Sequence, residues 1–307
     1  MSEPSRETPA SPRSRAMGTL VALAAGTLLG LPACRASLLR EPAWSDLLCE
    51  GRLVAQCASG YDAARHADTC KVYHRLFAPD GRQITKDLGG TYDHHRGLFF
   101  GFNRLRAGGE SWDFWHCRRG ESQRLVSVAP RSDPSVMDLA IDWITGHGEI
   151  VLRERRRIEA RPVPRGHALE IAIELRAVSK PVELDGDPQH SGFQVRALQR
   201  FADPDGPKVG YLRPETARGG EDDVWTGCDW VAGVLPMEGT KVTVLHEDLP
   251  GNPRPVRYST RPYGRFGSTF RARVEPGEPL RLRYRVAVLE GKAGRAEIQS
   301  LLANRRP

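Results

Sequence analysis

Apolar and polar residues alternate at every second position over much of this chain. From Leu169 to Leu175 each second residue is Leu or Ile, and Glu170 and Glu174 stand between them. Residues 281–288 repeat the pattern, with arginines at their first three polar positions. Because successive side chains of a strand point to opposite faces, this spacing predicts antiparallel strands with one buried and one solvated face.

Short strands recur at regular intervals, with turn residues between them. The turns Pro79-Asp80-Gly81 and Gly146-His147-Gly148 use residues that favour tight reversals. At the C-terminus, Ile298, Leu301 and Leu302 share one stripe of a predicted helix, 293–304. The pattern predicts an all-β protein, a large antiparallel β-sandwich with a short C-terminal helix. The further predicted strands are 71–77, 98–102, 124–128, 137–144, 149–158, 193–201, 241–245 and 269–274.

The N-terminal segment has the pattern of an export signal. Three arginines up to Arg15 precede an uncharged, apolar run over residues 17–33. The run ends in Leu31-Pro32-Ala33-Cys34, which resembles a bacterial lipobox with Cys34 as the lipidated residue. The alternatives are an ordinary signal peptide cut near Ala33 and a retained anchor. We therefore predict an exported, periplasmic or cell-surface protein, anchored to a membrane through its N-terminus.

The remaining chain is long enough for one large domain. We predict a signal peptide over residues 1–34, an N-terminal lead-in over 35–60 and a single β-sandwich over 61–307. No later segment approaches the roughly 20 apolar residues of a membrane helix. Cys49 with Cys57 or Cys70 is the candidate disulfide, although the sequence does not assign the connectivity.

The net charge of +7 does not indicate a nucleic-acid partner. The basic residues are spread along the chain, and the densest run, 153–157, is interrupted by Glu154. No helix-turn-helix, RNA-recognition or zinc-finger pattern accompanies them. An arginine-rich solvated surface is the simpler interpretation.

The densest polar cluster is Asp93-His94-His95-Arg96-Gly97, at the start of an apolar strand. Neighbours on a flat strand point to opposite faces, so His94 and His95 share one pocket only if the backbone turns there. Two imidazoles beside an arginine suit acid/base chemistry or ligand binding. The alternative is a structural histidine pair that holds a loop.

Other polar and aromatic residues could complete such a pocket. Trp112 and Trp115 with Asp113 would suit a sugar platform, because aromatic faces stack on pyranose rings; a core aromatic patch is the alternative. His190 is the third candidate catalytic residue, with His94 and His95. The predicted substrate-binding residues are Asp93, Arg96, Trp112, Asp113, Trp115, Gln194, Arg196, Asn252, Arg261 and Tyr263.

Cofactor motifs are missing from the sequence. Three histidines from separate loops would suit zinc, copper or iron, but no HxH or HExxH spacing supports a metal site. No GxSxG or phosphate-binding glycine loop occurs either. We therefore predict no cofactor and no metal ligands, and keep a metal held by His94, His95 or His190 as the lesser alternative.

The block from His94 to Leu98, followed by Asp113-Phe114-Trp115, resembles the bacterial PmoA-like family, known as methane oxygenase PmoA and otherwise of unknown function. Further similar blocks are 190–196, 252–254 and 261–264, and together they extend from about residue 73 to 291. The family's first block usually opens Asp-His-Pro, where this chain has Thr91-Tyr92-Asp93. Its later block usually reads Asp-His-Pro-x-Asn, and here Leu249 replaces the histidine.

The resemblance implies a secreted β-sandwich from sugar-degrading bacteria, of the mutarotase-like super-sandwich kind. The first hypothesis is a carbohydrate-active enzyme that uses His94 or His95 with His190 as acid and base on a sugar or an oxidised sugar. The second is a non-catalytic glycan-binding lipoprotein. The third is a mononuclear metal oxygenase.

Overall fold

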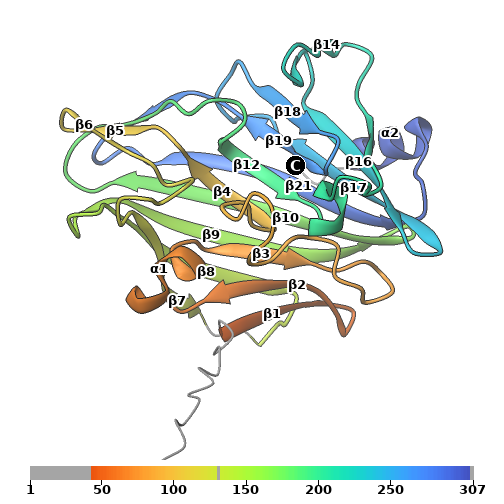
Figure 1. Cartoon of the computed structure of the whole chain (residues 1–307), viewed down its shortest axis with the longest axis horizontal. Helices are drawn as coiled ribbons and strands as arrows, with labels where there is room; N and C mark the ends of the chain where they lie inside the picture. The colour runs from red at the N-terminus through yellow and green to blue at the C-terminus, as the bar shows by residue number, and fades with distance from the viewer. Residues whose placement is uncertain (1–42, 130–131, 305–307) are drawn as a thin grey trace, which may run out of the picture. The chain divides into compact units, whose positions relative to one another are not determined.

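Two large antiparallel sheets make up most of the protein in the computed structural model, which describes residues 43–129 and 132–304 (Figure 1). In order across the nine-stranded sheet lie β1 (Ala43–Cys49), β2 (Arg52–Ser59), β3 (Tyr73–Leu76), β4 (Leu98–Phe102), β12 (Ser191–Arg196), β19 (Arg265–Thr269), β18 (Arg257–Arg261), β15 (Val224–Thr226) and β14 (Arg218–Gly219). The eight-stranded sheet has the order β13 (Gly210–Leu212), β16 (Trp230–Met237), β17 (Thr240–Asp248), β21 (Leu280–Glu290), β10 (Gly166–Ala177), β9 (Ile150–Val163), β8 (Val136–Ile144) and β7 (Ser122–Ala129).

Smaller elements complete the described part of the chain. A four-stranded sheet has the order β20 (Ala272–Val274), β11 (Val182–Leu184), β5 (Leu105–Ala107) and β6 (Glu110–Trp112). The helices are α1 (His66–Thr69), α2 (Arg295–Ala303) and two 3-10 turns, Ala63–Arg65 and Gln199–Ala202.

The main core lies between the two large sheets. Leu169 and Leu175 of β10 are fully buried in it, as the alternation predicts, and Phe100 and Phe193 meet them from the other sheet. Each sheet has one apolar face, and burial of the two apolar faces against each other stabilises the sandwich. The predicted class, a large antiparallel β-sandwich with a short C-terminal helix, is confirmed.

Arg285 departs from its predicted solvated position. It lies on the face of β21 that carries Arg281 and Arg283, yet it is 95% buried because its guanidinium pairs with Glu247 (Nε–Oε2 2.8 Å). Glu247 comes from the neighbouring strand β17, directly opposite Arg285. The cross-strand partner neutralises a charge that the local pattern alone assigns to water.

Most predicted strands form within a few residues of their expected bounds, and both predicted turns close hairpins. Gly81 and Gly148 adopt positive φ, +85° and +87°, which glycine tolerates without strain. The predicted strand 193–201 ends at Arg196, and the chain continues into a 3-10 turn. The large sheet begins earlier than predicted, because β1 and β2 fall in the segment 35–60 that we assigned to a lead-in.

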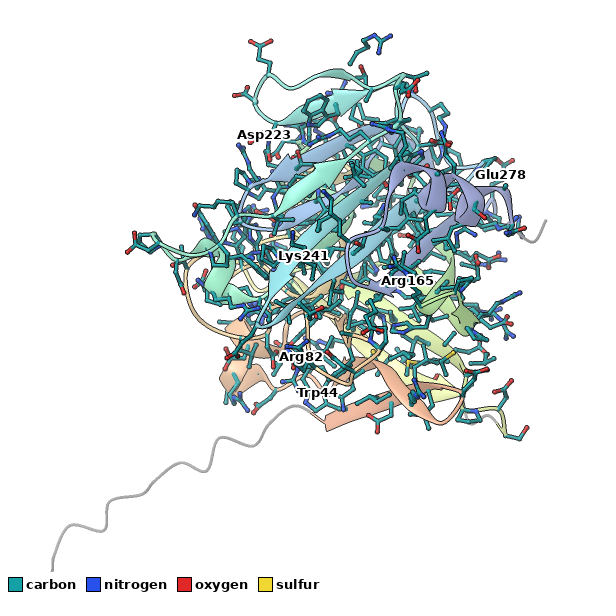
Figure 2. The ribbon with its side chains drawn as sticks, turned by 90° about the vertical axis from the view of Figure 1, so that its right-hand side faces the viewer. Trp44, Arg82, Arg165, Asp223, Lys241 and Glu278 are labelled. Carbon is teal, nitrogen blue, oxygen red and sulfur yellow. The ribbon has the colours of Figure 1, made fainter. Side chains whose placement is uncertain are left out.

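The C-terminal helix covers one end of the eight-stranded sheet on its outer face. Ile298 and Leu301 of α2 pack against Ala232 and Ala287, whose small side chains let the helix approach. Arg165 fixes the helix further through two hydrogen bonds to Glu297, at 2.9 and 2.8 Å (Figure 2). Within the residues that the structure describes, no helix is long and apolar enough to cross a membrane.

The cysteines do not pair as the sequence suggested. Cys49 lies opposite Arg52 and Cys57 opposite Ser45, so the two thiols stand far apart along the same hairpin. The five described cysteines are all free and buried, and Cys70 shares a side-chain hydrogen bond with Cys117 instead. The predicted lipid-bearing Cys34 and signal peptide lie outside the described residues.

Candidate active site

Four histidines from three separate loops meet on the outer face of the nine-stranded sheet. His94 and His95 lie between β3 and β4, His116 follows β6, and His190 directly precedes β12. Beneath them Phe99, on the face of β4 that points away from the core, packs against Trp115. The nine-stranded sheet therefore lies beneath the cluster, and the loops carry the four imidazoles.

The backbone turns at the adjacent histidines, the condition for both to share one pocket. Tyr92 adopts φ +57°, and the amide of His95 donates to its carbonyl at 2.9 Å. The two imidazole centroids then lie 4.3 Å apart. Gly97 is needed next to this turn, because a Cβ there would overlap the carbonyl oxygen of His74.

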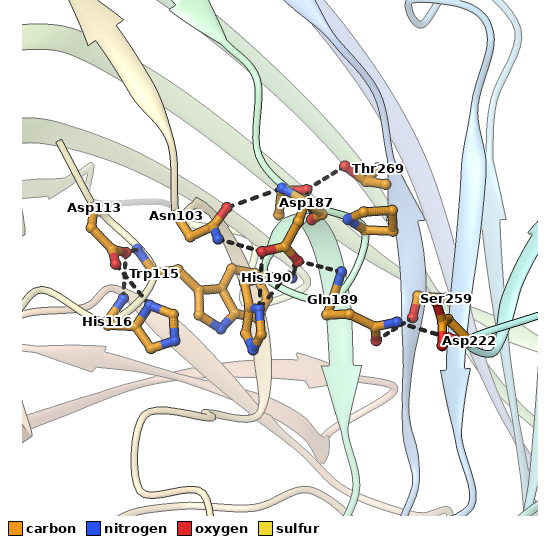
Figure 3. A network of polar contacts seen from close by, with 12 residues as sticks. Asn103, Asp113, Trp115, His116, Asp187, Gln189, His190, Asp222, Ser259 and Thr269 are labelled. Carbon is orange, nitrogen blue, oxygen red and sulfur yellow. Dashed lines mark hydrogen bonds and ion pairs between the residues drawn. The ribbon is translucent and has the colours of Figure 1, made fainter. Parts of the chain in front are cut away.

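His116 and His190 are held by the same local structure, formed twice. Asp113 Oδ1 accepts the amides of Trp115 and His116 at 2.9 and 2.8 Å, and its Oδ2 lies 2.8 Å from His116 Nδ1. Asp187 Oδ1 likewise accepts the amides two and three residues on, at 2.8 and 2.9 Å, and lies 3.1 Å from His190 Nδ1 (Figure 3). An ionised carboxylate only accepts hydrogen bonds, so each Nδ1 carries the proton and each Nε2 keeps a free lone pair.

Three of these imidazoles converge on one point. One ring nitrogen each of His94, His116 and His190 lies within 4.8 Å of the other two. The ring centroids of His94 and His116 are 4.6 Å apart, and those of His116 and His190 are 4.9 Å apart. His95 stands behind them, 4.3 Å from His94 and stacked at 6.3 Å on His190.

The surroundings of the cluster disfavour additional positive charge. Burial lowers the pKa of His94 to about 3, with Lys71 as the next contributor. Burial and then His94 lower the pKa of His95 even further. Although burial raises the pKa of Asp187, its hydrogen bond from His190 brings it down to about 2. His94 and His95 are therefore neutral near pH 7, while the carboxylate behind His190 is ionised.

The predicted arginines hold the backbone instead of facing the pocket. Arg96 is buried and donates to the carbonyls of Asp93, His95 and Ala67, which fastens the histidine turn to α1. Arg196 is buried as well and donates to the carbonyl of Tyr263 at 2.8 Å. Both guanidiniums are buried, including the Nε atoms that have no hydrogen-bond partner among the described residues, so neither is exposed to a substrate.

The two tryptophans are also placed differently from the prediction. Trp112 is 94% buried in the four-stranded sheet and contacts His147, away from the histidine cluster. Trp115 lies in the cluster, 6.1 Å from His190, but it is 98% buried. Neither indole offers an open face, so the sugar platform predicted from them does not form.

The remaining predicted residues divide between the pocket and its supports. Asp93 is 85% exposed at the side chain, with Oδ1 3.7 Å from His94 Nδ1, and Tyr263 stacks on Tyr92 at 4.9 Å. Arg261 pairs with Asp223 at 2.9 Å. Gln194 has a structural role, since its side-chain oxygen Oε1 accepts a hydrogen bond from the buried Arg265 at 2.7 Å. Asn252 has a structural role. Its side-chain nitrogen donates to the carbonyl of Arg283, and its side-chain oxygen accepts from the amide of the same residue.

Sequence reasoning left out His116, Asp187, Tyr92 and Arg265 as site residues. A signal for two of them was present, since Asp113 and Asp187 each precede a histidine by three residues. The repeated Asp-x-x-His spacing allows one carboxylate to bond both the amide and the ring of the same histidine. Arg265 had no such signal, because its partners Gln189, Gln194 and Ser259 come together only across the sheet.

A cavity of about 570 Å³ on the other large sheet contains none of the predicted site residues. Arginines of β9 and β21 line it, above alanines of β8 and β10. Two of them are compensated locally, Arg157 by Asp138 at 3.2 Å and Arg281 by Glu174 at 3.2 Å. It contains no histidine or cysteine, which leaves the imidazole cluster as the better candidate for chemistry.

Comparisons with known proteins give a family and several distant structures. The model of a family described as "Family of unknown function (DUF6807)" matches residues 45–303. No curated protein matches the chain. A protein assigned as an aldose 1-epimerase from Escherichia coli K12 is 9% identical, with a TM-score of 0.46 over 81% of this chain and 99% of that one. A GH36 α-galactosidase from Geobacillus stearothermophilus is 11% identical, with a TM-score of 0.40 over 82% of this chain and 41% of that one. No functional inference follows at these TM-scores.

Proposed function

This chain belongs to the DUF6807 family, whose function is unknown, and we propose from its site that it is a carbohydrate-active enzyme that moves a proton on a sugar or an oxidised sugar. The observation that carries the proposal is the pair of carboxylate-held imidazoles, His116 with Asp113 and His190 with Asp187, beside His94. A carboxylate on Nδ1 orients the ring and leaves Nε2 as a proton acceptor, the arrangement that general bases need.

The two imidazoles are accessible from solvent to different degrees. The side chain of His190 is 31% exposed and that of His116 is 15% exposed, whereas His95 is almost fully buried. His190 is therefore the imidazole that a substrate reaches most directly. His95, which the sequence placed beside it as a catalytic residue, stands behind the reacting surface.

A sugar suits the surface beside this histidine cluster. Tyr92 is 44% exposed and stacks on Tyr263, so an aromatic surface stands open at the histidine turn. Such a surface packs against the C–H face of a pyranose ring, while the exposed carboxylate of Asp93 accepts hydrogen bonds from hydroxyls. Tyr92 and Tyr263 thereby replace the two buried tryptophans as the proposed platform.

The reaction that these groups support is an isomerisation. The imidazole of His190 takes the proton from a carbon beside a carbonyl, and the electron pair of the broken C–H bond forms an enediolate. The protonated imidazole then gives the proton to the other carbon, while the hydroxyl proton moves between the two oxygens of the enediolate, so that an aldose and a ketose interconvert. No oxidant or reductant is consumed.

The test is exchange of carbon-bound hydrogen with solvent. The full-length chain is incubated in deuterium oxide with a panel of aldoses, ketoses, uronic acids and keto-sugars, and proton NMR follows the loss of C–H signals. We expect exchange with the wild type and with His147→Ala, an exposed histidine in the β8–β9 turn, and loss of at least 100-fold in His190→Ala. Saturable sugar binding without exchange would instead indicate a non-catalytic glycan-binding protein.

Export and lipidation remain part of the proposal on the strength of the N-terminal sequence. The basic start, the apolar run and Cys34 favour a lipid-anchored protein of the periplasm or the cell surface. Mass spectrometry of the mature N-terminus tests this, since a diacylglycerol-modified Cys34 and a plain terminus after Ala33 differ in mass by several hundred daltons. An intact Met1 would contradict export.

A further inference from the structure

We propose that His94, His116 and His190 bind one divalent transition-metal ion. The inference rests on the proposed function in that it names a cofactor for the same site. From the sequence a metal held by His94, His95 or His190 was only the lesser alternative, and His116 was not among its ligands, because the three ligands come from three loops and show no metal-binding spacing.

The donor set has the size and chemistry of a mononuclear site. The three nitrogens lie within 4.8 Å of one another. Zinc–imidazole bonds are about 2.0–2.1 Å long, which places ligand nitrogens about 3.4 Å apart around a tetrahedral ion. A small rotation of the rings about their side-chain bonds closes the set to that spacing.

The carboxylates behind two of the ligands are the second independent observation. Asp113 and Asp187 each accept from Nδ1, so the Nε2 atoms of His116 and His190 have lone pairs and no proton. Metal-binding histidines almost always donate their other ring N–H to such an acceptor, which fixes tautomer and orientation. The site holds two copies of this arrangement, built from the same turn.

The third ligand explains why an ion is favoured at this point. Nε2 of His94 is buried and has no hydrogen-bond partner among the described residues. Leaving a buried polar atom without a partner is unfavourable, because the atom has lost its hydrogen bonds to water. The neighbouring Nε2 atoms cannot supply a proton, because their own protons lie on Nδ1. A cation satisfies all three nitrogens at once.

Three neutral nitrogens leave at least one coordination position open. Imidazole ligands suit zinc, copper, iron and nickel, and three protein ligands with one open position are typical of catalytic zinc sites. A water or a sugar oxygen would take the fourth position, on the side where His190 is exposed. With an ion held by His94, His116 and His190, the lone pair of His190 would be taken up by the metal, and the metal would supply the activation of a bound water that the bare imidazole otherwise provides.

The experiment measures metal binding without any substrate. The full-length chain is stripped with a chelator, titrated with Co²⁺ followed by visible absorption, and then loaded with Zn²⁺, dialysed and analysed by elemental mass spectrometry. We expect one equivalent in the wild type and in His147→Ala. His116→Ala and His190→Ala should retain less than a tenth of an equivalent, with their thermal unfolding checked in parallel. Because Cys70 and Cys117 lie nearby, Cys117→Ser serves as a further control that should keep its metal.

The outcomes separate this inference from the proposed function. No tight equivalent in the wild type, or equal retention in the histidine variants, would overturn the metal site. Full deuterium exchange by the metal-free chain would also overturn its catalytic role while leaving the sugar chemistry in place. A histidine-dependent equivalent without exchange on any sugar would support the site and defeat the proposed reaction. Asn variants at the same histidines, which retain more side-chain volume, decide any case in which an Ala variant fails to fold.

Discussion

Asp187 Oδ1 bonds both the backbone amide and the ring Nδ1 of His190, at 2.9 and 3.1 Å, and Oδ2 lies 3.2 Å from the same Nδ1. One carboxylate thereby sets the position of the loop and the tautomer of the imidazole (Figure 3). Asp113 does the same for His116 with its two oxygens. Asp113 and Asp187 are therefore positioning residues, and substituting them should change what His116 and His190 bind.

Asp187→Asn should weaken metal binding more than it weakens the fold. The amide nitrogen in the place of Oδ2, which lies 3.2 Å from Nδ1, can donate to the ring, which moves the ring proton to Nε2 and removes the lone pair that binds the ion. Loss of such an outer partner costs about 10–100-fold in metal affinity. Competition titration with Zn²⁺ and a chromogenic chelator measures it. Asp205→Asn, an exposed aspartate in a loop, is the control, and an equal loss in both variants would contradict the role of Asp187.

Gly192→Ala should destabilise β12, the strand that follows His190 and carries Gln194. Gly192 adopts φ +81°, and a Cβ there would overlap the carbonyl oxygen of Ser268 on β19. Strain plus overlap should lower the free energy of unfolding by about 2 kcal/mol or more, measured by urea denaturation.

Gly210→Ala is the matched control for this substitution. A Cβ at Gly210 meets nothing within 4 Å, so its unfolding free energy should stay within about 0.5 kcal/mol of wild type. Similar losses in the two variants would show that the close approach of β12 and β19 is not the cause.

Glu154→Ala should leave a charge unpaired in the core. Glu154 Oε1 lies 2.7 Å from Nε of Arg156, both side chains are fully buried, and Trp143 donates to the other carboxylate oxygen at 2.9 Å. Removing one member of a buried pair typically costs about 3–5 kcal/mol. On the same strand, the partly exposed Glu159 pairs with Arg161 at 3.2 Å, and Glu159→Ala should cost no more than about 1 kcal/mol. Chemical denaturation of both variants compares them directly.

His167 should contribute to loss of stability in mild acid. Burial lowers its pKa to about 4 in the folded protein, against about 6.5 in the unfolded chain. Between these values the unfolded chain binds the proton and the folded protein does not. The contribution of neutral His167 to stability is therefore fully present above about pH 6.5 and is lost as the pH falls toward 4. One such group changes the free energy of unfolding by at most about 1.4 kcal/mol per pH unit.

Denaturation curves between pH 4 and 7 test this contribution. His167→Gln has no titrating ring and should show a shallower slope over this window than the wild type. His147→Gln, at an exposed turn, should keep the wild-type slope. An unchanged slope in His167→Gln would assign the acid sensitivity to other buried groups.

The sequence by itself determined the architecture. Alternation is a local property, and each predicted strand buries the side that its own residues make apolar, as Leu169 and Leu175 show. Turn residues such as Gly81 and Gly148 act through their own φ, so they too can be predicted without knowledge of the fold. The C-terminal helix formed where its apolar stripe predicted it, for the same reason.

Only the tertiary structure decided what the polar residues do. The partners of Arg96 and Arg196 are carbonyls of distant loops, and the partner of Arg285 is a glutamate on a neighbouring strand. His190 meets His94 because β4 and β12 are neighbours in one sheet, and His116 joins them from the loop after β6. Hydrogen bonds and ligand sets depend on distances across strands, which local residue patterns do not contain, whereas the burial of an apolar face depends on the period of the strand alone.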